Sequence, residues 1–203
     1  MFVIESWPDT GKTGPRVVAS ADTRIVADVL TPFPDIVVWS RKVPETWPDL
    51  ISQETQPSEP LTLSGPAEQL RTWLRDKDPF PKTLSFLRDD IDQTLSLTAA
   101  LGAARTLRLT CHPVTGPFTP TLSAGSSPGS SLCALCLYGK GTLTLFHEDG
   151  NERSKALNPD PHALTFCRSA LHAVPQPEFR TLNGSRCFAL AIEAFTSETS
   201  SSY

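Results

Sequence analysis

The chain has 203 residues, 39% of them hydrophobic, and a formal net charge of −4 at pH 7, which suits one domain with an elaborated end and a sizeable core. It has no long basic run interleaved with aromatic residues, so we expect no nucleic-acid partner. No apolar run reaches the roughly 18 residues that span a bilayer and the start does not read as a secretory signal, so we expect no membrane association and a cytoplasmic location.

The first fifty residues alternate short strands with helical segments. Residues 20–30 predict a helix, capped by Ser20 or Asp22, that ends before the prolines of "TPFPD". The polar, proline-bearing stretch 53–63 predicts a linker. Apolar or β-branched runs predict short strands at residues 2–4, 16–19 and 35–43.

Two longer helices are expected before the middle of the chain. In residues 64–76, Pro66 fits the first helical position and an apolar stripe follows it. In residues 83–101, apolar side chains recur at spacings of three and four, and Gly102 stands where a helix ends. We assign the four tryptophans to packing of these segments on a sheet: Trp7, Trp39, Trp47 and Trp73.

From residue 105 onward the apolar period becomes two, which is typical of strands. Glycines at 139 and 141 divide the long run 131–146 into two strands. Two serine-rich stretches, 123–131 and 196–203, predict a mobile loop and a disordered tail. The remaining strand-like runs are 106–114, 116–123, 163–169, 171–174 and 185–195. Several strands after a largely helical half indicate an α+β protein, a β-sandwich or jelly roll supported by N-terminal helices.

The cysteines favour packing over metal binding or redox chemistry. All five lie in apolar runs, as expected of buried thiols in a reducing compartment. Cys133 and Cys136 form a Cys-x-x-Cys pattern, but positions three apart on a strand face opposite ways.

Two histidines are expected to be solvated. His147 and Asp149 match the first two ligands of a two-histidine, one-carboxylate iron site, but they stand just before "DGN", where a solvated hairpin turn is the better interpretation. His162 lies in a proline-rich turn, and we expect it to be solvated as well.

Residues 106–195 resemble the core of Fe(II)/2-oxoglutarate dioxygenases of the prolyl-hydroxylase type. The elements that carry this resemblance are "GPFTPTLS", "LCALCLYGK", "GTLTLF", "PDPHALTFCRSALHAV" and "SRCFALAIEAF". The resemblance implies a distorted double-stranded β-helix, cupin-like, over residues 104–196. On this division residues 1–103 form a helical and mixed supporting region, and 197–203 a disordered tail.

The same resemblance implies roles for particular residues. His172 aligns with the distal iron ligand, and Arg186 with the cation that grips the tail carboxylate of 2-oxoglutarate, Arg180 being the second choice. Where the family has His-x-Asp, this chain has Thr121 and Ser123, whose neutral hydroxyls are poor ligands for ferrous iron. The sequence therefore predicts a degenerate metal site.

A second resemblance is to an uncharacterised bacterial domain-of-unknown-function family, number 1826, over residues 25–195. It is carried by "DIVVWSRKVP", by the helix that ends "LGAARTLRL" and by "YGKGT". Members of that family keep a Phe-His-x-Asp where this chain has lost it. His112, on the strand before the degenerate motif, is a candidate replacement ligand or general base; the alternative is a histidine hydrogen-bonded at a strand end.

We expect the four candidate residues Thr121, Ser123, His172 and Arg186 to converge on one pocket suited to a small acidic molecule. The favoured function is small-molecule binding, or non-oxidative acid–base chemistry with His172, on a 2-oxoglutarate-oxygenase-like scaffold. One alternative is an active oxygenase with an unusual ligand set, which would need Fe(II) and 2-oxoglutarate. A second is a non-catalytic interaction protein.

Overall fold

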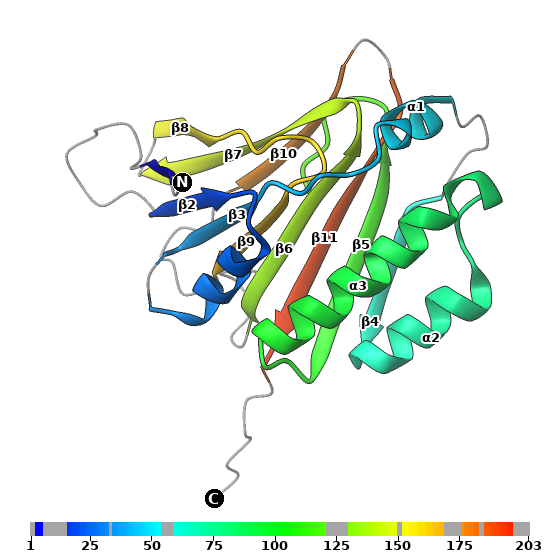
Figure 1. Ribbon diagram of the computed structural model, residues 1–203, viewed down its shortest axis with the longest axis horizontal. Helices are drawn as coiled ribbons and strands as arrows, with labels where there is room; N and C mark the ends of the chain where they lie inside the picture. The colour runs from blue at the N-terminus through cyan, green and yellow to red at the C-terminus, as the bar shows by residue number, and fades with distance from the viewer. Residues whose placement is uncertain are drawn as a thin grey trace, which may run out of the picture.

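A computed structural model describes residues 3–5, 16–32, 34–53, 59–120, 130–149, 152–168, 176–182 and 185–196 (Figure 1). Within these ranges lie eleven strands, three α-helices and two 3₁₀-helices. The strands are β1 (Val3–Glu5), β2 (Val17–Ser20), β3 (Ile36–Trp39), β4 (Leu61–Gly65), β5 (Thr106–Val114), β6 (Ser130–Gly139), β7 (Gly141–Asp149), β8 (Glu152–Leu157), β9 (Leu164–Arg168), β10 (Gln176–Thr181) and β11 (Cys187–Phe195). The helices are η1 (Thr23–Leu30), α1 (Thr46–Gln53), α2 (Ala67–Lys77), η2 (Lys82–Leu84) and α3 (Ser85–Leu101).

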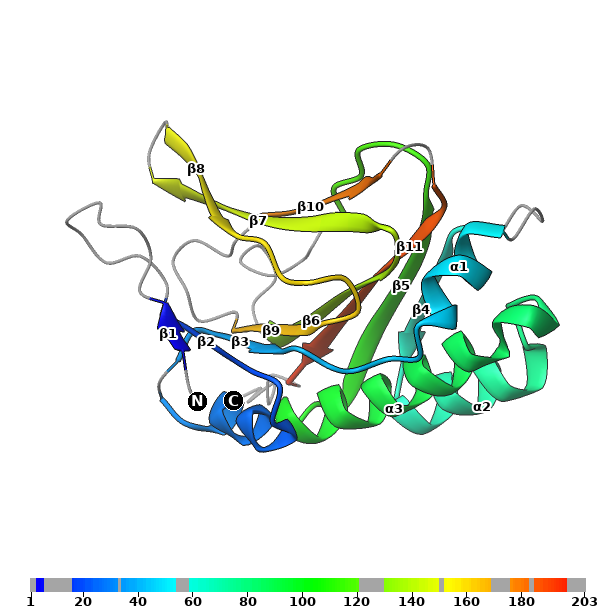
Figure 2. The same cartoon turned by 45° about the horizontal axis from the view of Figure 1, so that its top comes forward.

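The strands form two sheets that face each other, and the helices α2 and α3 cover the outer face of the larger sheet (Figure 2). The larger sheet has the order β1-β2-β3-β9-β6-β11-β5-β4, and the smaller has the order β10-β7-β8. Phe118 adds a further row to the smaller sheet through a bridge to Phe179 of β10. None of the helices in the described ranges is both long and apolar enough to cross a membrane.

The path of the chain between the two sheets is that of a double-stranded β-helix. It runs from β5 in the large sheet to Phe118 in the small one, back to β6, across to β7 and β8, back to β9, across to β10, and ends in β11 of the large sheet. This alternation, with antiparallel pairing of β5, β11, β6 and β9, is the jelly-roll arrangement. The predicted α+β fold class is confirmed.

Strands from before residue 103 extend this sheet at both edges. At one edge β3 pairs with β9, and β2 and β1 follow it; at the other, β4 pairs antiparallel with β5. The predicted linker over 53–63 is therefore wrong at its end, because β4 begins at Leu61. Leu61 and Leu63 pack on the core while Thr62 and Ser64 are exposed, an alternation that suits an edge strand.

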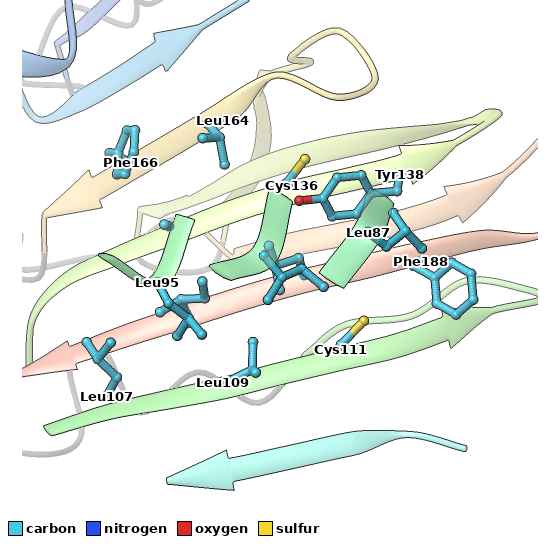
Figure 3. Close-up of a cluster of buried hydrophobic side chains, with 14 of the residues drawn as sticks. Leu87, Leu95, Leu107, Leu109, Cys111, Cys136, Tyr138, Leu164, Phe166 and Phe188 are labelled. Carbon is cyan, nitrogen blue, oxygen red and sulfur yellow. The ribbon is translucent and has the colours of Figure 1, made fainter. Parts of the chain in front are cut away.

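The core beneath the helices is made by α3 and the outer face of β5, β6 and β11. Leu87, Ile91 and Leu95 of α3 are fully buried, and they meet side chains such as Leu109 and Phe188 (Figure 3). Burying each such side chain contributes about 1.5–3 kcal/mol, so α3 is fixed firmly to the sheet.

The predicted first helix forms, but as the 3₁₀-helix η1. Asp22 caps it as expected, since its carboxylate accepts a hydrogen bond from the Arg24 amide at 3.0 Å. The Ile25 amide donates to the Asp22 carbonyl oxygen and the Thr31 amide to the Asp28 carbonyl oxygen, each at 3.1 Å. Bonds to the third preceding residue are those of a 3₁₀-helix.

Candidate functional site

The space between the two sheets is where the resemblance predicts a binding site. Side chains of β11 alternate about the sheet: Phe188, Leu190 and Ile192 face the helices, while Cys187, Ala189 and Ala191 lie between the sheets. The same alternation separates Cys133, which lies between the sheets, from Cys136, which lies beneath the helices. The prediction that these two thiols face opposite ways is confirmed.

Apolar side chains from both sheets fill the described part of this interior. Leu137 of β6, Leu143 and Leu145 of β7, and Phe179 of β10 are each at most 2% exposed and belong to one cluster. By alternation, the described inward positions of β6, β7, β10 and β11 carry no cation. Consequently these four strands present no partner for a carboxylate between the sheets.

Two buried polar groups of the described residues interrupt the interior. Thr165 of β9 is fully buried, and its hydroxyl has no hydrogen-bond partner in the part of the chain that the structure describes. Glu193 of β11 is 2% exposed and forms an ion pair of 3.6 Å with Arg108 of the neighbouring strand β5. Glu193 is also in register with Cys133, which is in turn in register with Cys167 of β9, so a carboxylate and two thiols lie in one row across three strands.

The predicted site residues divide into those inside and those outside the described ranges. Thr121, Ser123 and His172 lie outside them. Within the described residues, no group of three or more histidine, cysteine, aspartate or glutamate side chains is arranged to hold a metal ion. The residues that can be placed thus do not supply the facial ligand set that ferrous iron needs.

The two arginine candidates lie at the end of the sheets where β10 turns into β11. Arg186 is half-buried and directly precedes β11, whose first inward position is taken by Cys187. The Cys187 thiol donates to the Lys140 carbonyl oxygen at 3.0 Å. Arg180 has a side chain that is 60% exposed and pairs with Glu178, beside the inward-facing Phe179.

His112 of β5 is half-buried and held by protein contacts. Its Nδ1 donates to the Pro113 carbonyl oxygen at 2.8 Å, and its ring stacks on Phe118, with centroids 4.0 Å apart and planes 14° from parallel. These contacts leave Nε2 as the ring nitrogen available as an acceptor.

His147 and Asp149 belong to strand β7, in register with Ser154 and Glu152 of β8. The predicted hairpin therefore forms, with both residues in its final paired rows.

A second polar group, which sequence reasoning missed, lies beneath the helices. Arg41, just after β3, makes two hydrogen bonds to the Asp90 carboxylate of α3, at 2.7 and 3.0 Å, and its Nε donates to the His162 carbonyl oxygen at 3.0 Å. The Tyr138 hydroxyl of β6 donates to the same carboxylate at 2.5 Å. Both members of the Arg41–Asp90 pair have side chains only 10% exposed. We call these four residues the Arg41–Asp90 cluster.

The expectation that His162 is solvated is wrong. The residue is 3% exposed, neither ring nitrogen has a hydrogen-bond partner among the described residues, and its backbone is left-handed, with φ 68°. Burial, with a contribution from the nearby Arg41 charge, lowers the pKa of His162 to about 4, so the imidazole is neutral. The turn is proline-rich as the sequence indicated, but Trp47 and Tyr138 cover it edge-on, with ring centroids 6.3 and 6.0 Å from the imidazole.

Two sequence signals could have revealed this cluster. Asp90 falls on the apolar stripe of the helix, between Leu87 and Ile91, and a carboxylate there requires a buried partner. Tyr138 likewise follows the apolar run of residues 132–137 near the end of β6. What the sequence does not state is that Arg41, 49 residues before Asp90, supplies the charge.

A cleft of about 500 Å³ opens beside the Arg41–Asp90 cluster. It lies among the start of η1, the segment after β3, α1 and α3. The side chains that give it its chemistry are Trp39, Arg41, Lys42, Trp47, Asp90 and Gln93. Its volume is in the range of pockets that hold small organic molecules.

No known family profile matches the chain, and no curated protein matches it. Among solved structures, it is similar to a prolyl-4-hydroxylase from Pseudomonas putida, at 12% identity over 86% of this chain and 93% of that chain, with a TM-score of 0.44. It is similar to a Trichoplax adhaerens prolyl hydroxylase, solved with a hypoxia-inducible-factor peptide, at 12% identity over 84% of this chain and 87% of that chain, with a TM-score of 0.41. It is also similar to a 2OG-Fe(II) oxygenase family oxidoreductase from Burkholderia pseudomallei, at 12% identity over 84% of this chain and 88% of that chain, with a TM-score of 0.42. The fold assignment depends on the strand order described above and not on these likenesses.

Proposed function

We propose that the protein binds a small acidic molecule on a double-stranded β-helix and does not carry out iron-dependent oxidation. The observation that argues against iron-dependent oxidation is the apolar filling between the sheets, where Leu137, Leu143, Phe179 and Cys187 occupy inward positions. A 2-oxoglutarate tail carboxylate buried there would meet no cation from β6, β7, β10 or β11, and the Arg108 guanidinium of β5 is already paired with Glu193. An unpaired buried carboxylate costs several kcal/mol.

The chemistry of the candidate ligands supports the same proposal. By the sequence resemblance, Thr121 and Ser123 stand where an oxygenase has an imidazole and a carboxylate, and hydroxyls bring neither the nitrogen nor the charge that ferrous iron prefers. His172 would then serve binding or acid–base chemistry rather than metal ligation. The five free, buried thiols fit a reducing cytoplasm as the place where the protein works.

The proposal is tested first by metal content and turnover. Protein purified without chelator is analysed for iron, and succinate release from 2-oxoglutarate is measured after ferrous iron is added. We expect substoichiometric iron and no succinate above a heat-treated control. Stoichiometric iron with succinate release that is lost in His172→Ala would overturn the proposal and establish an active oxygenase.

The second test is direct binding, by calorimetry, of succinate, 2-oxoglutarate, benzoate and the neutral benzamide. The proposal predicts that at least one acid binds more tightly than benzamide. If none of the acids binds at about 10 mM, the protein is not an acid-binding protein and the proposal fails.

A further inference from the structure

We infer that the cleft beside the Arg41–Asp90 cluster is the acid-binding site and that its ligand is an aromatic monocarboxylate. The inference rests on the proposed acid-binding function and adds a place and a ligand class to it. The place differs from the one predicted from the sequence, because it lies on the helix-covered side of the large sheet and not between the sheets.

The walls of the cleft suit a flat apolar ring. Trp39 and Trp47 both line it, and both indoles are fixed by neighbours. The Arg41 guanidinium carbon lies 5.8 Å from the centroid of the Trp39 ring, and Trp47 stacks on Phe86 with centroids 4.5 Å apart and planes 24° from parallel. Aromatic side chains already fixed in place lose little conformational entropy when a ligand ring packs on them.

The charges in the lining favour one carboxylate. Asp90 is the lining's carboxylate, and it is neutralised by the two bonds from Arg41 and further satisfied by the Tyr138 hydroxyl. Lys42 is the second cation of the lining, it is exposed, and no acidic side chain of the described residues pairs with it. The lining therefore carries one uncompensated positive charge, which a monocarboxylate matches and a dicarboxylate exceeds.

The polar floor of the cleft is fixed before any ligand arrives. Arg41 uses its Nε on the His162 carbonyl oxygen and both terminal nitrogens on Asp90, so it cannot swing away to solvent without breaking three hydrogen bonds. The turn that supplies that carbonyl is strained, and within the described ranges its buried imidazole has no hydrogen-bond partner. Strain and unmet hydrogen bonding are typical of places that a fold retains for function.

Lys42→Ala tests the inference, because Lys42 is exposed and its removal should leave folding intact. Benzoate binding is measured by calorimetry and by quenching of tryptophan fluorescence. We expect saturable quenching in the wild type and about fivefold weaker binding in Lys42→Ala. Lys82→Ala, an exposed lysine at the start of η2 and outside the lining, is the matched control and should bind as the wild type does.

The ligand panel separates the failures of the two proposals. We expect benzoate to bind about fivefold or more tightly than both benzamide and succinate. If succinate or 2-oxoglutarate binds best, with affinity unchanged in Lys42→Ala but reduced in Arg186→Ala, the cleft inference is overturned and the acid-binding function stands. If no acid binds, the cleft inference and the acid-binding function are both overturned.

Discussion

The hydroxyl of Tyr138 donates a 2.5 Å hydrogen bond to the Asp90 carboxylate, and this contact joins the end of β6 to the middle of α3. Both residues are buried, at 0% and 9% exposure. Because Arg41 binds the same carboxylate, one aspartate holds together a strand, a helix and the segment after β3.

Breaking this cluster should cost more than breaking surface ion pairs. Tyr138→Phe removes a hydrogen bond to a charged acceptor, and we expect it to lower the free energy of unfolding by about 1–3 kcal/mol. Asp90→Asn leaves the buried Arg41 charge uncompensated and should cost about 3–5 kcal/mol. Urea unfolding followed by circular dichroism measures both.

Asp89→Asn is the control for these variants. Asp89 is the adjacent residue on α3 and pairs with Arg88 at the surface, where its side chain is 64% exposed. Its loss should change stability by less than about 1 kcal/mol. Equal effects of Asp89→Asn and Asp90→Asn would contradict a structural role for the cluster.

His162 should make the protein less stable in mild acid. Its pKa is lowered from 6.5 to about 4 in the folded protein, so below pH 6.5 the unfolded chain binds a proton that the folded one does not. This proton leaves the free energy of unfolding unchanged above about pH 6.5 and lowers it progressively as the pH falls toward 4. Between pH 7 and pH 5 the wild type should lose about 2 kcal/mol more than His162→Phe does. Parallel losses in the two proteins would show that the imidazole is not buried neutral.

The turn between β6 and β7 should not tolerate a methyl group at Gly141. A Cβ there would lie 2.4 Å from the Arg180 carbonyl oxygen and 2.9 Å from a Leu137 methyl group, so the strands must move apart. We expect Gly141→Ala to cost about 1–3 kcal/mol in thermal or urea unfolding. Gly116→Ala serves as the control, because a Cβ there has nothing within 4 Å. A neutral Gly141→Ala would mean that the two sheets are less tightly joined at this end.

The thiols should be unreactive until the protein unfolds. All five cysteines are free and buried, and burial raises the pKa values of Cys111, Cys136, Cys167 and Cys187 to about 12. With so little thiolate, Ellman's reagent should react slowly with native protein and label five thiols after denaturation. Rapid labelling of one thiol in the native state would identify a cysteine that is exposed in solution.

Local patterns in the sequence predicted most elements of the fold. Pro66 marks the start of α2, the apolar spacing of Leu87, Ile91 and Leu95 identified α3, and Gly139 and Gly141 divide β6 from β7. These signals are local, because caps, periodicity and turn residues act over a few positions.

The buried polar cluster could not be predicted in the same way. Arg41 and Asp90 are separated by 49 residues, and Tyr138 lies a further 48 beyond Asp90, so only the folded chain brings them together. His162 was misjudged because proline-rich turns usually face water, whereas here Trp47 and Tyr138 cover the turn. Tertiary packing decided its environment.

The pairing of β3 with β9 has a consequence for how the chain is made. Ile36 lies opposite Cys167, so a strand synthesised early must wait for one that leaves the ribosome some 130 residues later. Until then the backbone edge of β3 that will face β9 is unpaired. Such an edge is a template for pairing with other chains. We therefore expect slow refolding that is sensitive to protein concentration, because an early strand of the chain pairs with a late one.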